Sequence, residues 1–261
     1  MTRPSALAIY AILYLVFLYL PVLFLPLFSF NSGTIVAFPI KGWTLDWYRQ
    51  LGGEATLIQA LVNSLMVGFA AALMATSMGL FAARAYVRYR FRGKTASEGL
   101  VMLPLVIPGI IVASSMLVLF ISIGIKPSLT AVTLGHTFLA LPFSVSIMKS
   151  AFDDFDPSLE EAAFDLGSGV FETFRRVTLP IVAPGIVASL LVTFTVSFDE
   201  FVLAFFLSGN QPTLPVYIWS QIRFPAKLPN TLALGSLLLL ASVALLVVAE
   251  YFRRRSTTSA S

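Results

Sequence analysis

The chain has 261 residues, of which 57% are hydrophobic and 11% are charged, and its mean hydropathy is +0.88. This composition excludes an ordinary water-soluble domain, because a single core cannot bury so much apolar surface, and it favours a chain that lies in lipid. The lack of cysteine excludes disulfides and thiolate metal sites, the single histidine excludes a multi-histidine metal cluster, and the net charge of +4 comes from basic residues beside apolar segments, as in membrane proteins.

Six apolar segments are long enough to cross the hydrocarbon layer, which takes roughly 20 helical residues. We expect transmembrane helices at residues 6–30, 60–87, 99–125, 129–148, 184–207 and 232–251. The first segment is too long for the apolar core of a signal peptide, so it is expected to be a retained helix. Pro104 and Pro108 in the third segment and Pro142 in the fourth predict kinked helices in a packed bundle.

The basic residues predict the orientation of these helices. Twelve Lys and Arg residues flank the segments on one side and five flank them on the other, and the richer side is expected in the cytoplasm. Both termini are therefore expected in the cytoplasm, with outer segments at 31–57 and 208–231. These outer segments carry aromatic residues suited to the membrane interface, namely Trp43, Trp47, Tyr48, Tyr217 and Trp219.

The connection at about 153–183 is more polar than the rest of the chain and long for a link between two helices. Asp156 before Pro157 is a helix start signal that predicts a short helix over 158–166. Glycines at 167 and 169 are expected to end it, and a second helix over 170–177 is expected to stop near Pro180. The spacing places apolar residues on one face of the first helix (Leu159, Ala162, Ala163 and Leu166) and acidic residues on another (Glu160, Glu161 and Asp165).

One pattern in this connection resembles a known family motif. Glu161-Ala162-Ala163, then three residues and Gly167, then nine residues and Val177-Thr178-Leu179-Pro180, resembles the EAA loop of type I ATP-binding-cassette importer permeases. The resemblance runs from about residue 63 to 252, and valine stands at 177 where isoleucine is usual. It implies an all-α permease fold with six transmembrane helices and cytoplasmic coupling helices.

In that family the loop fits a cleft on an ATPase subunit. The resemblance therefore implies ATPase-coupling roles for Glu161, Ala162, Ala163, Gly167, Leu179 and Pro180. It also implies two ATPase subunits, a second permease subunit and a periplasmic solute-binding protein as partners in a bacterial inner membrane. The expected domains are an N-terminal helix and outer segment at 1–57, the permease domain at 58–255 and a disordered tail at 256–261. Arg175 and Arg176 either pair with ATPase carboxylates or mark the cytoplasmic side.

Two acidic residues fall inside the fifth segment, in the sequence FTVSFDEFVLAFF. A carboxylate facing lipid is costly, so Asp199 and Glu200 are expected to line a substrate path and attract a cation, or else to pair with a basic residue. Neighbouring helical residues point about 100° apart, so the two are expected to have different roles. Ser197-Phe-Asp-Glu-Phe201 and the following SGNQPTLPVYIW resemble the spermidine/putrescine permease group, with opine, iron and phosphonate carriers as alternatives.

The sequence predicts no catalytic, metal or cofactor site in this chain. Arg92-Gly93-Lys94-Thr95 lacks the upstream glycine and the strand of a phosphate-binding loop, so ATP and Mg are expected on partner subunits. The other class considered is an ion-coupled secondary transporter that uses Asp199, Glu200 and His136, although His136 is expected to be a structural, hydrogen-bonded residue. No inverted repeat supports that class, and a non-transporting scaffold leaves the loop spacing unexplained.

Overall fold

A computed structural model describes the backbone of residues 6–258 and the side chains of residues 7–243. The described residues form helices joined by short turns, with a single isolated β-bridge between Asn31 and Trp43. The α-helices are α1 (Ala6–Ser29), α2 (Asp46–Leu51), α3 (Ala55–Arg88), α4 (Lys94–Met102), α5 (Gly109–Ser122), α6 (Leu129–Asp153), α7 (Ser158–Asp165), α8 (Val170–Thr173), α9 (Leu179–Phe198), α10 (Val202–Leu207), α11 (Leu214–Ile222) and α12 (Leu228–Thr258). Short 3₁₀ or π turns lie at Leu103–Leu105, Phe174–Thr178 and Pro225–Lys227.

Five stretches of the described chain are long and apolar enough to cross a membrane, and one bent helix pair makes a sixth. The single stretches are Leu7–Ser29, Ala55–Arg88, Leu129–Asp153, Val170–Phe198 and Pro225–Val243. The prediction of an all-helical membrane protein is confirmed. The described α12 runs to Thr258, beyond the start of the tail expected at 256, and residues 259–261 lie outside the described part.

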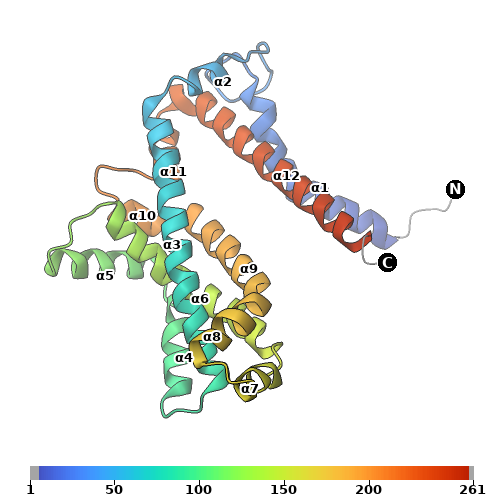
Figure 1. The fold of residues 1–261 in the computed structure, drawn as a ribbon. Helices are drawn as coiled ribbons and strands as arrows, with labels where there is room; N and C mark the ends of the chain where they lie inside the picture. Colours follow the sequence, from blue (N-terminus) through green and yellow to red (C-terminus); the bar gives the residue numbers. More distant parts are fainter. Residues whose placement is uncertain (1–5, 259–261) are drawn as a thin grey trace. The chain divides into compact units, whose positions relative to one another are not determined.

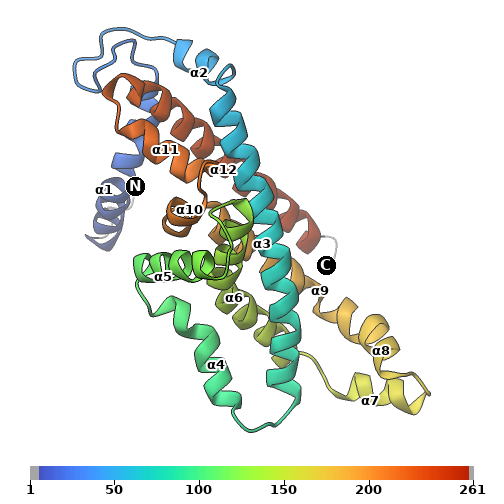
Figure 2. The ribbon, with the colours of Figure 1, turned by 90° about the vertical axis from the view of Figure 1, so that its left-hand side faces the viewer.

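The third predicted segment is not one kinked helix. α4 and α5 meet at 104°, and Figures 1 and 2 show α5 running across the direction of α3. Pro104 and Pro108 each lack a backbone N–H donor, and the residue before a proline avoids helical geometry. Pro108 itself has ψ of 130°, which is extended backbone. Two prolines four residues apart therefore break the helix instead of kinking it.

The chain divides into two packing units. One contains residues up to Ile58 and residues from Ile218 onward, and the other spans Gln59–Tyr217. In the first unit α1 packs along α12, and α12 also contacts α2. The domain division expected from the sequence, at 57 and 58, concerns the extent of a homologous domain and stays a prediction.

Asn31 organises the outer loop of the first unit. This buried side chain accepts hydrogen bonds from the N–H groups of Gly33 and Lys41, at 3.1 and 3.3 Å. The indole of Trp47 donates to the carbonyl of Asn31 at 2.8 Å, and the hydroxyl of Tyr48 lies 2.6 Å from that of Ser29. Two of the predicted interfacial aromatics therefore also hold the loop together.

The second unit is built on α3, α6 and α9, with α5 and α10 packed at one side. A buried chain of hydroxyl groups joins the three long helices: Ser189 donates to Ser144 at 2.9 Å and lies 3.0 Å from Thr76. Small residues let these backbones approach closely, as in other membrane bundles. Gly79 lies against Ser144, and Gly185 lies against Ala151.

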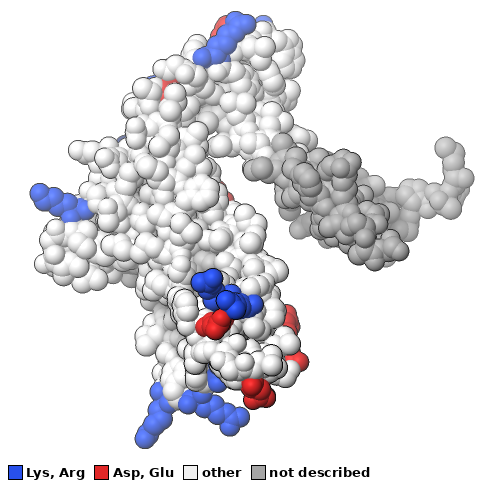
Figure 3. Space-filling view, in the orientation of Figure 1, with Lys and Arg blue, Asp and Glu red and all other residues white. Residues whose placement is uncertain are grey.

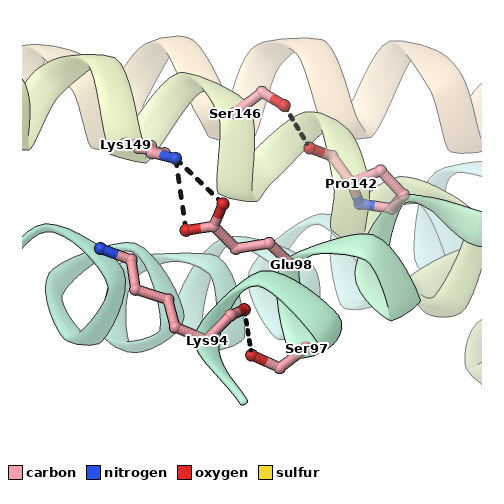
Figure 4. Close-up of polar contacts among 6 residues, drawn as sticks. All are labelled: Lys94, Ser97, Glu98, Pro142, Ser146 and Lys149. Carbon is pink, nitrogen blue, oxygen red and sulfur yellow. Dashed lines mark hydrogen bonds and ion pairs between the residues drawn. The ribbon is translucent and has the colours of Figure 1, made fainter. Parts of the chain in front are cut away.

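An ion pair joins α4 to the long helix α6. Figure 4 shows Glu98 on α4 and Lys149 on α6 facing each other, with the ammonium group 3.3 Å from both carboxylate oxygens. Ser97 donates to the carbonyl of Lys94 at 2.8 Å on the same helix (Figure 4). α4, which precedes the bend, is thus held to α6 by an ion pair as well as by packing.

Gly79→Ala should destabilise the second unit. An alanine Cβ at this position would lie 2.8 Å from the Cβ of Ser144 and 3.0 Å from its carbonyl carbon, so α3 and α6 would have to separate. Overpacking of this kind costs about 1–3 kcal/mol, and we expect a lower midpoint of thermal unfolding in detergent. The matched control is Gly99→Ala on α4, where an added Cβ meets nothing within 4 Å. Equal midpoints for the two variants would contradict this account of the packing.

Candidate functional site

The polar connection forms a helix, a reversal and a second helix at one end of the second unit. The carboxylate of Asp156 accepts the N–H of Ser158 at 2.9 Å and so starts α7, as the Asp-Pro pair predicts. This hydrogen bond to the backbone is the main reason that the pKa of Asp156 lies below its usual value. The predicted first helix is confirmed.

The reversal after α7 depends on Gly167. Its φ is +89°, a conformation that residues with a Cβ rarely adopt. The N–H of Gly167 donates to the carbonyl of Phe164 at 2.9 Å, and that of Ser168 donates to Ala163 at 3.0 Å, which closes the end of α7. Gly169 is extended, and α8 begins directly after it. Gly167 thus ends the first helix as predicted, whereas Gly169 lies in the link before the second helix.

Burial on α7 does not follow the two faces that the spacing predicts. Glu160 is buried, with 8% of its surface exposed, whereas Leu166 is 87% exposed and Leu159 is 43% exposed. The apolar side chains of Val170 and Phe171 on α8 are exposed as well. Glu160 faces the bundle because its basic partners lie there, and the apolar side chains lie on the outside of the loop.

The partners of Glu160 come from two other elements. Its carboxylate lies 3.5 Å from Arg84 and 3.2 Å from Arg88, both near the end of α3. The hydroxyl of Thr178 donates to it at 2.5 Å. This cluster is not among the predicted sites, although the sequence carries a signal for it. Arg84 falls inside an apolar segment, where a charged residue needs a partner, and Arg88 follows one helical turn later.

The second helix does not stop near Pro180. α8 passes through a π turn at Phe174–Thr178 directly into α9, and the whole stretch Val170–Phe198 is one candidate span. A proline ring inside a regular helix clashes with the carbonyl four residues earlier. A π turn is wider than an α turn, so it gives that ring room while the helix continues.

Four of the six residues with expected coupling roles are exposed on this loop. Glu161, Ala162 and Gly167 are exposed, whereas Ala163 is 9% exposed and packs inward. Leu179 is half-buried and Pro180 is exposed where the chain enters α9. Arg176 pairs with Glu172 at 2.8 Å on the surface, and Arg175 is exposed. On the face drawn in Figure 3, charged side chains of this unit gather at the end that carries α7 and the α3–α4 hairpin.

The fifth predicted span is also broken. α9 ends at Phe198 and α10 begins at Val202, so Asp199 and Glu200 lie between two helices instead of inside one. Glu200 accepts the N–H of Leu203 at 3.1 Å and thereby caps α10, whereas Asp199 is exposed. Within the described part of the chain, no Lys or Arg lies within ion-pair distance of either acid. The two carboxylates thus differ in surroundings.

His136 lies beside this break. Its imidazole is 1% exposed, and Nδ1 lies 2.8 Å from the hydroxyl of Ser197 on the last turn of α9. The contact ties α6 to α9 two residues before Asp199. Among the described residues, no three His, Asp or Glu side chains gather as a metal site would require.

Comparison with known proteins finds similar chains among the membrane components of transport systems. Residues 75–258 match the family described as "Binding-protein-dependent transport system inner membrane component". The spermidine/putrescine transport system permease protein PotC of Haemophilus influenzae is 34% identical over 241 residues, which cover 92% of this chain and 93% of that one. The putrescine transport system permease protein PotI of Escherichia coli is 33% identical over 248 residues, which cover 92% and 88%.

A solved structure has the same fold. A chain of a bacterial ABC transporter involved in the import of the acidic polysaccharide alginate aligns over 97% of this chain and 98% of its own length, with a TM-score of 0.73 and 15% identity. The family match covers more than half of the chain, and the two curated relatives cover nearly all of it. The chain therefore belongs to the family of inner membrane components of binding-protein-dependent transport systems.

Proposed function

We propose that this chain is the permease subunit of an ATP-driven importer that carries polyamines such as putrescine and spermidine across the bacterial inner membrane. The observation that carries the cargo assignment is the likeness, along nearly the whole chain, to permeases named for spermidine and putrescine. Polyamines are flexible polycations. The exposed carboxylate of Asp199, at the break between α9 and α10, offers a charge of the opposite sign.

The exposed α7–α8 loop supports docking of an ATPase. It presents Leu159, Leu166, Val170 and Phe171 to the outside, and apolar side chains on a short helix suit a groove on a soluble partner. Glu161, Ala162, Ala163 and Gly167 would form the contact, and Leu179 with Pro180 would set how the loop enters α9. ATP and Mg would be held by that partner, so this chain itself would hold no cofactor.

The orientation of the chain and its other partners follow from this assignment. The α7 end of the second unit, with both termini, would face the cytoplasm, and the segments around 31–57 and 208–231 would face a periplasmic solute-binding protein. A second permease subunit, of a related but different sequence, would complete the path. ATP-driven closure of two ATPase subunits would then open that path to the binding protein, and hydrolysis would return it to the inward-facing state.

Gly167→Ala should reduce ATP-dependent uptake. Holding alanine at positive φ costs about 1–2 kcal/mol, so the reversal would relax and misplace α8 relative to α7. The measurement is uptake of labelled putrescine and spermidine into vesicles that contain this chain, its companion permease, ATPase and binding protein. We expect a several-fold loss, and a similar loss for Glu161→Ala.

The matched control is Gly169→Ala, because this glycine is extended and an added Cβ meets nothing within 4 Å. It should leave uptake close to wild type. Uptake driven by an ion gradient without any ATPase would defeat the importer assignment. ATP-dependent import of another small solute, with no polyamine import, would keep the importer and replace the cargo.

Asp199→Asn should lower polyamine uptake without loss of stability. The side chain is exposed, and no described residue would lose a hydrogen-bond partner by the substitution. A fivefold fall in uptake at low polyamine concentration corresponds to about 1 kcal/mol. Glu200→Ala should instead lower the thermal midpoint, since removing a cap costs about 1 kcal/mol. The control for surface charge is Asp153→Asn, an exposed acid at the end of α6. Unchanged uptake in Asp199→Asn would remove this residue from the path.

A further inference from the structure

The buried cluster around Glu160 joins three separate elements. Glu160 belongs to α7, Arg84 and Arg88 to the last turns of α3, and Thr178 to the π turn before α9. Only 10% of the Glu160 side chain and 16% of each arginine side chain are exposed. One carboxylate therefore connects the exposed loop to two long helices at once.

Aromatic rings close the cluster on two sides. The guanidinium of Arg84 lies over the ring of Phe174 at 4.6 Å, and that of Arg88 lies over Phe155 at 5.1 Å. Phe155 belongs to a buried apolar group with Leu80, Ala83, Met148, Phe152 and Val182. Cation–π contacts strengthen as water is excluded, and the same exclusion strengthens the attraction between the opposite charges.

A buried arrangement of this kind differs from the surface pairs of the loop. Arg176 and Glu172 are 70% and 46% exposed, and such pairs contribute little to stability. In contrast, losing one member of a buried ionic cluster leaves uncompensated charge, so one relative placement of the parts is strongly preferred. The cluster thus fixes how α7 sits on the end of α3.

α3 connects this cluster to the opposite end of the second unit. It has 34 residues, or about 51 Å at 1.5 Å per residue. Near its other end the amide of Asn63 donates to the carbonyl of Pro212 at 2.9 Å, and the hydroxyl of Ser64 accepts the N–H of Leu214 at 2.8 Å. One continuous helix therefore links the segment between α10 and α11 to the loop that carries α7 (Figure 2).

We propose that Glu160, held by Arg84, Arg88 and Thr178, is the positioning residue that makes α7 and α3 move as one body. This inference rests on the proposed function, in which an ATPase displaces α7. The displacement would then reach the Asn63 and Ser64 contacts through α3, instead of being lost in a flexible loop. Glu160 does not touch cargo or nucleotide in this scheme.

The first test measures cargo imported per ATP hydrolysed in the assembled transporter. Glu160→Gln keeps the shape of the side chain but removes the charge, and we expect this ratio to fall about tenfold, within the range of measured couplings between sites, while ATP hydrolysis continues. Thr178→Val keeps the shape of the side chain and all charges and removes one donor, so it should give a smaller fall in the same direction. If Glu160→Gln does not assemble, Thr178→Val still decides the question.

The matched control is Glu98→Gln. This residue also joins two helices through an ion pair, but its partner Lys149 lies on α6 (Figure 4). It should keep the wild-type ratio. A fall of the same size in Glu98→Gln and Glu160→Gln would assign the effect to general loosening of the unit, which would overturn the proposal.

The second test measures directly how rigidly α7 is held against α3, a connection called the α7–α3 joint below. The chain has no cysteine, so spin labels can be placed on Leu166→Cys in the loop and Tyr89→Cys after α3, both of which are exposed. We expect a narrow distance distribution with Glu160 intact and a broad one in Glu160→Gln and Thr178→Val. Unchanged distributions and an unchanged import ratio would overturn the joint. Failure of the wild-type complex to import polyamine, with a narrow distribution that broadens in the variants, would reject the cargo and keep the joint.

Discussion

The absence of water from the hydrocarbon layer is the constraint on which this structure depends. Every backbone N–H and C=O group in that layer must find a partner within the protein, so the apolar segments fold as helices. Where the chain departs from a helix, other groups satisfy the backbone. Glu200 accepts the N–H of Leu203 at the break between α9 and α10, and the prolines at 104 and 108 bring no N–H to the bend between α4 and α5.

The same constraint explains where charge is found in the second unit. Arg84 lies inside a long apolar helix and is tolerated because Glu160 and the ring of Phe174 surround it. Arg176 and Glu172 on the surface do not need each other as partners, since both side chains reach solvent. A buried charge in a membrane bundle therefore points to a specific partner, and here the partner lies on the loop proposed to meet the ATPase.

The exposed loop and the buried cluster have complementary roles in the proposed cycle. The outer side of α7 and α8 presents apolar residues to a partner, and the inner side fixes α7 to α3 through Glu160. The π turn before α9 lets the loop continue into a membrane helix without interruption, despite Pro180. A displacement at the loop would thus reach two long helices, α3 directly through charge and α9 directly through the backbone.

The sequence by itself determined the helical membrane class, the positions of most spans and the α7–Gly167–α8 reversal, because long apolar runs and the Asp-Pro and glycine signals act locally. It was wrong about the third and fifth spans and about Pro180, because whether a proline or a carboxylate breaks a helix depends on what neighbouring elements offer the freed backbone groups. The spacing grouped Glu160 with Glu161 and Asp165 on an acidic face of α7, but it did not say which face turns inward. Only the tertiary structure decided that face, because the arginines that draw Glu160 inward lie more than 70 residues earlier in the chain.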